Sequence, residues 1–85
     1  MAEFKLSKRV ERDLINIAKY TIQNFGEQQS LKYKTELFNC FNRLANNLDL
    51  GRSAFEFRAG LKRYNFKAPT VFYEATAYGI FIVRV

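Results

Sequence analysis

Turn-forming residues constrain the fold of this chain more than any other feature of its sequence. Six segments are separated by four glycines and one proline: Gly26, Gly51, Gly60, Pro69 and Gly79. Both residue types fit turns and disfavour the interior of helices and strands, so these positions are expected between regular elements. A chain of 85 residues divided in this way forms one domain, residues 1–85, with a small core.

The first half of the chain carries the periodicity of two amphipathic helices. Residues 3–6 alternate polar and apolar side chains, which is typical of a short edge strand, and Ser7 then offers an N-cap oxygen. From there to Phe25, and again from Glu27 to Leu48, apolar side chains recur every three or four residues. The first stripe consists of Val10, Leu14, Ile17, Ala18, Thr21 and Phe25. A short glycine linker between two such segments predicts a helical hairpin.

Three runs of aromatic and β-branched residues fill the second half. They span residues 61–66, 70–75 and 80–85, and turn residues separate them, so they predict an antiparallel meander. The expected fold class is therefore α+β: a strand, a helical hairpin and a three-stranded meander, with the helices packed on one face of a four-stranded sheet.

The last run is apolar on both alternating faces until Arg84, which predicts a central strand that is covered twice. Two helices can cover one face only. Three alternatives remain for the other face: the loop that carries Phe55 and Phe57, a partner chain, or a C-terminal segment that this sequence lacks.

Composition excludes several classes of function. The chain has no histidine, which removes histidine-based catalytic relays and imidazole metal sites. Its one cysteine, Cys40, excludes disulfide scaffolds and thiolate zinc sites, and no cofactor is expected. The N-terminus lacks the apolar region of a signal peptide, and no apolar stretch reaches membrane-spanning length, so we expect a cytoplasmic protein that does not contact a membrane.

Positive charge is concentrated in the second half. The net charge of the whole chain is +6, and residues 51–85 carry the larger part of it on fewer residues. The basic residues there are Arg52, Arg58, Lys62, Arg63, Lys67 and Arg84. One interpretation is a solvated surface; the other is a face that meets nucleic acid or an acidic protein, with Tyr64, Phe66 and Tyr73 interleaved.

No catalytic constellation stands out among the remaining residues. Glu56 and Glu74 are scattered, the glycines are isolated, and Cys40 lies inside a predicted helix. A histidine-free nuclease, with Lys and Arg stabilising the transition state and Tyr carrying a proton, is the enzymatic alternative.

The sequence resembles the ParE branch of the ParE/RelE toxin superfamily, the toxic halves of bacterial toxin–antitoxin pairs. The matching positions in the first half are Leu6-Ser7, Asp13-Leu14, Ile17, Tyr20-Thr21, Phe25-Gly26, Phe41, Leu44-Ala45-Asn46-Asn47 and Leu50-Gly51-Arg52. Those in the second half are Glu56, Arg58, Gly60-Leu61, Tyr64, Phe72-Tyr73, Ile80 and Ile82-Val83-Arg84-Val85. The fold of this family is the layout expected above.

The resemblance implies two alternative activities. ParE-like members poison DNA gyrase by binding it, whereas RelE-like members cut messenger RNA on the ribosome, here with Lys62, Arg63, Arg84 and Tyr64. Ala68-Pro69-Thr70 stands where members often carry Arg or His, which favours gyrase as the target. A basic module that only binds nucleic acid is a third alternative. The basic residues of the second half, Arg52, Arg58, Lys62, Arg63, Lys67 and Arg84, are the predicted target-binding set.

The resemblance also implies an acidic, partly disordered antitoxin that folds over the toxin, and a possible higher-order toxin–antitoxin oligomer. We expect it to contact Tyr64, Phe66, Tyr73, Ile80 and Ile82, with the two isoleucines on the apolar outer face of the last strand. Members usually continue past the last strand with a short polar tail linked to toxicity, which implies that this chain is a shortened or attenuated form.

Overall fold

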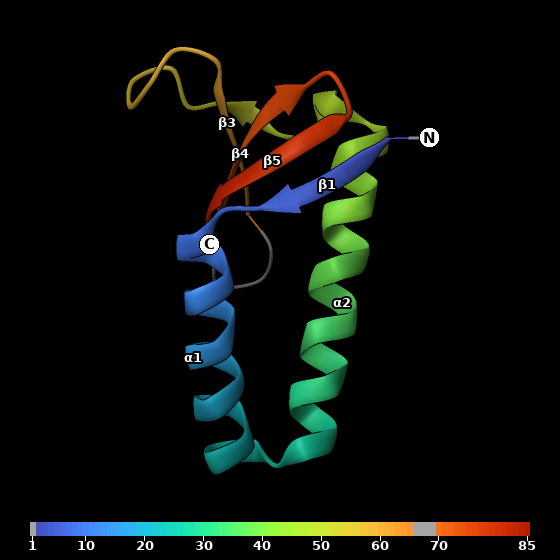
Figure 1. Ribbon diagram of the computed structural model, residues 1–85, viewed down its shortest axis with the longest axis vertical. Helices are drawn as coiled ribbons and strands as arrows, with labels where there is room; N and C mark the ends of the chain where they lie inside the picture. The colour runs from blue at the N-terminus through green and yellow to red at the C-terminus, as the bar shows by residue number, and fades with distance from the viewer. Residues whose placement is uncertain (1, 66–69) are drawn as a thin grey trace.

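A single strand, a helical hairpin and four further strands follow one another along the chain (Figure 1). The computed structural model of the protein describes residues 2–65 and 70–85. In chain order the elements are β1 (Glu3–Leu6), α1 (Lys8–Phe25), α2 (Glu27–Asn46), a 3₁₀ turn η1 (Leu48–Leu50), β2 (Arg52–Ser53), β3 (Leu61–Asn65), β4 (Thr70–Thr76) and β5 (Gly79–Arg84). This order confirms the α+β class expected from the sequence.

The boundaries of the hairpin follow from two residues that the sequence identifies. The Ser7 hydroxyl accepts a hydrogen bond from the backbone N–H of Val10 at 3.1 Å, which satisfies one of the free donors at the start of α1. Gly26 ends α1 with a φ of +91°, and its N–H donates to the carbonyl of Ile22. The predicted N-cap and hairpin turn are both confirmed.

The sheet has five strands, in the order β1-β5-β4-β3-β2. β1 is parallel to β5, and the other neighbours are antiparallel. The expectation of four strands was wrong because Arg52 and Ser53 pair with Arg63 and Lys62 to form a two-residue edge strand. A segment this short has no periodicity from which a strand could be predicted.

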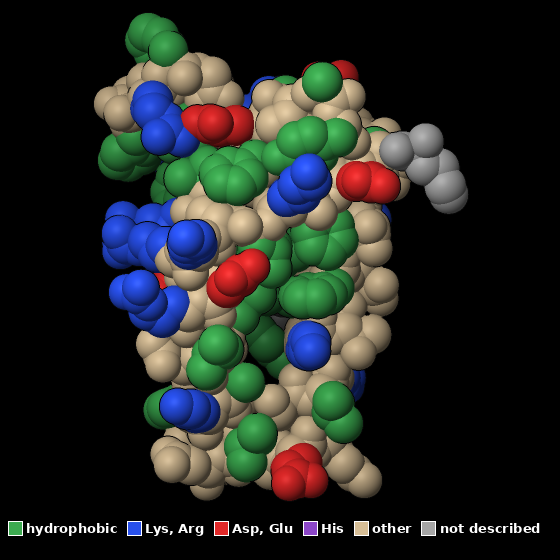
Figure 2. Space-filling view, in the orientation of Figure 1, with side chains coloured by type: hydrophobic (Ala, Val, Ile, Leu, Met, Phe, Trp, Pro, Cys, Tyr) green, Lys and Arg blue, Asp and Glu red, His purple; other side chains and the backbone are tan. Residues whose placement is uncertain are grey.

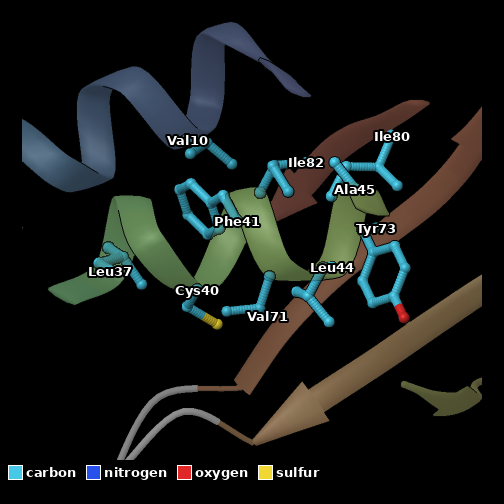
Figure 3. Close-up of a cluster of buried hydrophobic side chains, with 10 residues drawn as sticks. All are labelled: Val10, Leu37, Cys40, Phe41, Leu44, Ala45, Val71, Tyr73, Ile80 and Ile82. Carbon is cyan, nitrogen blue, oxygen red and sulfur yellow. The ribbon is translucent and has the colours of Figure 1, made fainter. Parts of the chain in front are cut away.

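The core lies between one face of the sheet and the two helices, and α2 supplies half of its buried side chains (Figure 3). The buried set is Val10 from α1; Leu37, Cys40, Phe41, Leu44 and Ala45 from α2; Val71 and Tyr73 from β4; and Ile80 and Ile82 from β5. We call the sheet face that packs on this cluster the inner face, and the opposite one the outer face.

β5 lies in the interior of the sheet between β1 and β4, as its apolar sequence predicts. Ile80 and Ile82 on the inner face are fully buried, whereas Phe81 and Val83, which alternate with them, are half-buried. Of the alternatives for the outer cover, the loop before β3 contacts this face, but through Phe57 against Phe72 of β4, with ring centroids 5.9 Å apart. The outer side of β5 stays partly exposed.

Candidate functional site

Two surfaces of the described residues have the character of binding sites, and the first is a groove between the helices. It has a volume of about 430 Å³ and is open to solvent along the hairpin (Figure 2). Leu6 of β1 and both helices contribute its walls. The lining residues are Leu6, Glu11, Leu14, Ile15, Ile17, Ala18, Thr21, Ser30, Leu31, Tyr33, Lys34, Leu37 and Phe38.

The groove is apolar. Glu11 and Lys34 are the two charged residues that line it, and hydrophobic side chains occupy the hollow between α1 and α2 in Figure 2. Leu31 and Ile15 are 65% and 56% exposed. Large apolar side chains that converge on a concave surface and remain this exposed are typical of a protein-binding site.

The groove forms because the hairpin is longer than the sheet that it covers. The 18 residues of α1 extend for about 27 Å at ~1.5 Å per residue, whereas the four residues of β1 extend for about 13 Å. Val10 near the sheet is therefore buried, whereas Leu14, Ile17 and Ala18 further along the same stripe are only partly buried. The sequence identified the stripe but not its exposure; comparing the helix and strand lengths could have revealed it.

The second surface is a row of side chains that crosses the outer face of the sheet. Arg52 of β2 is opposite Arg63 of β3, Arg63 is opposite Phe72 of β4, and Phe72 is opposite Arg84 of β5. Residues opposite one another in antiparallel strands share a face, so the four side chains form one line across four strands. We call these four residues the arginine row.

A β-bulge completes the arginine row. The pairing of β4 with β5 shifts by one residue between Phe72 and Tyr73. Without this shift, Val83 would be opposite Phe72, and Arg84 would lie beside Val71, on the inner face. The extra residue therefore turns Arg84 toward the outer face, where it is exposed.

Two ion pairs connect the loop between β2 and β3 to the outer face of the sheet. Arg58 pairs with Glu74 of β4, and Glu56 lies 3.4 Å from the guanidinium of Arg63. Phe57, between them in the chain, packs edge-on against Phe72 and is 67% exposed. Lys5 and Glu3 of β1 are exposed on the same side, so the described outer face carries four arginines, one lysine and three glutamates, and remains positively charged.

The predicted target-binding residues do not all share one face. Arg52, Arg58, Arg63 and Arg84 lie on the outer side, whereas Lys62 is opposite Tyr73 and donates to the carbonyl of Leu48 at 2.9 Å. Lys67 lies outside the described residues.

Lys62 and Tyr64 are on the opposite side of the sheet from Arg63 and Arg84. Tyr64 packs against the core cluster, where it is only partly exposed. The four side chains named for messenger RNA cleavage are therefore not brought together around one point.

The prediction of which residues contact the antitoxin needs a correction. Tyr73, Ile80 and Ile82 are fully buried on the inner face, so the prediction that the two isoleucines lie on the outer face was wrong. The physical reason is that α2 packs on this side of β5, which leaves Phe81 and Val83 to face outward. Phe66, also named in that set, lies outside the described residues.

Tyr73 is a structural residue. Its hydroxyl donates to the carbonyl of Leu48 at 3.3 Å, and its ring lies so close to Gly51 that a Cβ there would overlap it. Burial raises the pKa of Tyr73 above its ordinary value of 10.0. Burial likewise raises the pKa of Cys40 above 9.0, although Arg43 nearby opposes this, so the thiol is held neutral in the core.

In the part of the chain that the structure describes, no helix is both long and apolar enough to cross a membrane. Nor do three or more Cys, Asp or Glu side chains gather among residues 2–65 and 70–85 in a way that could hold a metal ion.

Comparisons with known proteins agree with this architecture. A sequence model of the family described as ParE toxin of type II toxin–antitoxin system, parDE, matches residues 4–85. Toxin ParE1 of Mycobacterium tuberculosis, from strain H37Rv as from strain CDC 1551, is 32% identical over 99% of this chain and 87% of the relative. Toxin ParE1 of Caulobacter vibrioides is 32% identical over 86% of this chain and 76% of its own length.

A solved structure has the same fold. The one described as the chromosomal ParDE TA system from P. aeruginosa aligns with a TM-score of 0.79 and 16% sequence identity, over 99% of this chain and 92% of that chain. The family match over residues 4–85, together with the two relatives at 32% identity, shows that this chain belongs to the ParE family of toxins of type II toxin–antitoxin systems.

Proposed function

We propose that this toxin inhibits DNA gyrase by binding it, without a covalent step of its own, and that a ParD-type antitoxin neutralises it. The observation that carries the proposal is the match to the ParE family over residues 4–85, on a chain with the strand, hairpin and meander of a ParDE structure. The exposed arginines of the outer face are the expected target-binding residues.

The separation of Lys62 and Tyr64 from Arg63 and Arg84 supports binding over RNA cleavage. General acid–base catalysis requires the proton carrier within hydrogen-bond reach of the reacting group, beside the cations that stabilise the transition state. Here the strand register places Tyr64 on the opposite side of the sheet from Arg84. Although Tyr64 and Arg63 both line a hollow beside β3, Lys62 and Arg84 do not line it. A surface of exposed arginines can still bind an acidic partner.

We propose that the antitoxin occupies the groove between α1 and α2 with the apolar face of an amphipathic helix. The groove offers an apolar channel between two helices, with Leu31 and Ile15 exposed and the charges of Glu11 and Lys34 at its walls. This is the geometry in which helix-in-groove recognition buries residues three and four positions apart. A ParD-type partner is the occupant because the chain belongs to the ParE family.

Gyrase inhibition is tested with purified gyrase and relaxed plasmid. We expect the toxin to block supercoiling, and the Arg52→Ala and Arg84→Ala variants to need several-fold more protein for the same block. Arg12→Ala on α1 is the matched control, since this arginine is also exposed but lies in the helical layer, which packs on the inner face of the sheet. Unchanged supercoiling at a large excess of wild-type toxin would contradict the gyrase proposal.

The antitoxin site is tested with Leu31→Glu. A carboxylate at position 31 would lose its hydration beneath the apolar face of the partner helix, so we expect antitoxin affinity to fall at least about tenfold. Asn39→Glu, on an exposed part of α2 outside the groove lining, should bind the antitoxin like the wild type. Equal affinities of the two variants, measured by calorimetry, would place the antitoxin elsewhere.

A further inference from the structure

The arginine row has a shape that a single small anion does not require. Arg52, Arg63 and Arg84 lie on β2, β3 and β5, so they are distributed over three inter-strand spacings of ~4.8 Å, about 14 Å in all. A phosphate or a single carboxylate would be held by cations that converge on one point. Cations in a line fit a polymer that carries a negative charge on every repeat unit.

Aromatic rings lie within this line of charge. Phe72 is the third residue of the arginine row, and Phe57 packs against it at an interplanar angle of 84°. Phe57 is 67% exposed, so a free ring surface lies beside the arginines. Rings of this kind on an open sheet face stack with unpaired bases, and the neighbouring cations hold the phosphates.

From this arrangement we infer that the outer face of the sheet binds single-stranded DNA. A duplex hides the faces of its bases and would leave the rings unused, and a run of Asp and Glu residues offers no aromatic ring to stack on them. The preference for DNA over RNA rests on the proposed function, because gyrase acts on DNA. Binding of the strand by the toxin alone does not depend on gyrase.

Two features of the site regulate the strength of this binding. Glu56 lies 3.4 Å from the guanidinium of Arg63 and competes with a phosphate for it. The β-bulge between Phe72 and Tyr73 supplies Arg84, without which the row would end at the centre of the sheet. Removal of the negative charge of Glu56 should therefore strengthen binding of the strand. A general loss of structure would not have this effect.

The experiment measures fluorescence anisotropy of a labelled single-stranded thymidine oligonucleotide with the purified toxin, in the absence of gyrase. Three neutralised phosphates predict that the affinity falls with salt with a log–log slope of about −2, at ~0.7 per phosphate. Arg84→Gln should bind several-fold more weakly and reduce the slope by about 0.7. Phe57→Ala should weaken binding at least about fivefold with the slope unchanged.

Control variants keep the test specific. Glu56→Gln should bind more tightly than the wild type, because Arg63 is released, and Arg12→Gln on α1 should bind equally well. Binding that Arg84→Gln and Arg12→Gln weaken to the same extent would overturn the inference, as would equal affinity for a duplex. Tighter binding of an RNA strand of the same sequence would overturn the choice of DNA. A toxin that binds the strand but leaves supercoiling intact would contradict the proposed function alone.

Discussion

Gly79 begins β5 where this strand pairs with β1. Its φ is +146°, and a Cβ at this position would overlap the backbone of Glu3. Gly79→Ala should therefore lower the free energy of unfolding by about 2–4 kcal/mol, because a strained φ and an overpacked contact with immobile backbone add together. Urea unfolding followed by circular dichroism measures this difference.

Gly60→Ala separates the two contributions. Gly60 also has a positive φ, +81°, but no atom lies within 4 Å of the position that its Cβ would take. This variant should lose only the part due to the strained φ, about 1 kcal/mol. If both alanine variants lowered the free energy of unfolding equally, the contact with Glu3 would not be the reason for glycine at position 79.

Arg84 shows the limit of prediction from side-chain alternation. In a regular strand Ile80, Ile82 and Arg84 would share one face, and burial of the two isoleucines would place the arginine on the inner side. The bulge reverses the last of these positions. Nothing in the residues of β5 alone marks the bulge, because it depends on how β4 and β5 pair.

At the scale of elements, Ser7 couples the start of α1 to the sheet. Its hydroxyl accepts from the N–H of Val10 and donates to the carbonyl of Val83, both at 3.1 Å. Ser7→Ala removes the helix cap and leaves a strand carbonyl without this donor. We expect the free energy of unfolding to fall by about 1–2 kcal/mol, measured by urea unfolding.

Ser7→Thr is the matched control. Threonine keeps a hydroxyl that can cap the helix and donate to Val83, so this variant should retain most of the stability. Hydrogen exchange adds a local measurement: in Ser7→Ala the amides of the first turn of α1, Val10 among them, should exchange faster than those of α2. A uniform increase over both helices would argue against a local role of Ser7.

The helices themselves were predictable, because each has a long apolar stripe and a clear boundary residue. The packing of the helices was less predictable. The stripe of α1 predicts burial for Leu14 and Ile17 as much as for Val10, yet the first two line a groove. An apolar stripe indicates that this face of the helix contacts another apolar surface. It does not distinguish the core of the same chain from a partner.

The local sequence pattern also fails to predict β2. Arg52 and Ser53 become a strand only because β3 offers an edge for them to pair with. The same tertiary pairing assigns neighbouring basic residues to different sides, so that Arg63 joins the arginine row while Lys62 turns toward Leu48. The excess of charge in residues 51–85 was visible in the sequence. Its division between two faces required the register of the sheet.

At the scale of the whole molecule, the two candidate binding surfaces lie on opposite sides of the sheet. The groove belongs to the helical layer, and the arginine row to the outer face. The proposed partner helix and the proposed DNA strand would therefore meet different sides of one small core. The core cluster lies between the two surfaces, and Tyr73 and Cys40 are the titratable groups within it.

Because of these two buried groups, the stability of the whole domain should fall at alkaline pH. Burial raises the pKa of Tyr73 above 10.0 and that of Cys40 above 9.0, so the fold holds both groups in their neutral, protonated forms. Below these ordinary values the folded and unfolded chains bind the same protons, and the free energy of unfolding does not change through either group. Above them the unfolded chain releases protons that the folded chain retains, and stability falls.

Urea unfolding at a series of pH values should show this loss. We expect a free energy of unfolding that is level near neutral pH and falls above about pH 9, by at most about 1.4 kcal/mol per pH unit for each group. Tyr73→Phe should be less stable at neutral pH, because it loses the hydrogen bond to Leu48, but its stability should fall less steeply above pH 10. Tyr20→Phe removes a hydroxyl from a side chain that is 63% exposed, and should follow the wild-type curve. A Tyr73→Phe curve parallel to that of the wild type throughout would mean that Tyr73 is not the group whose ionisation destabilises the core.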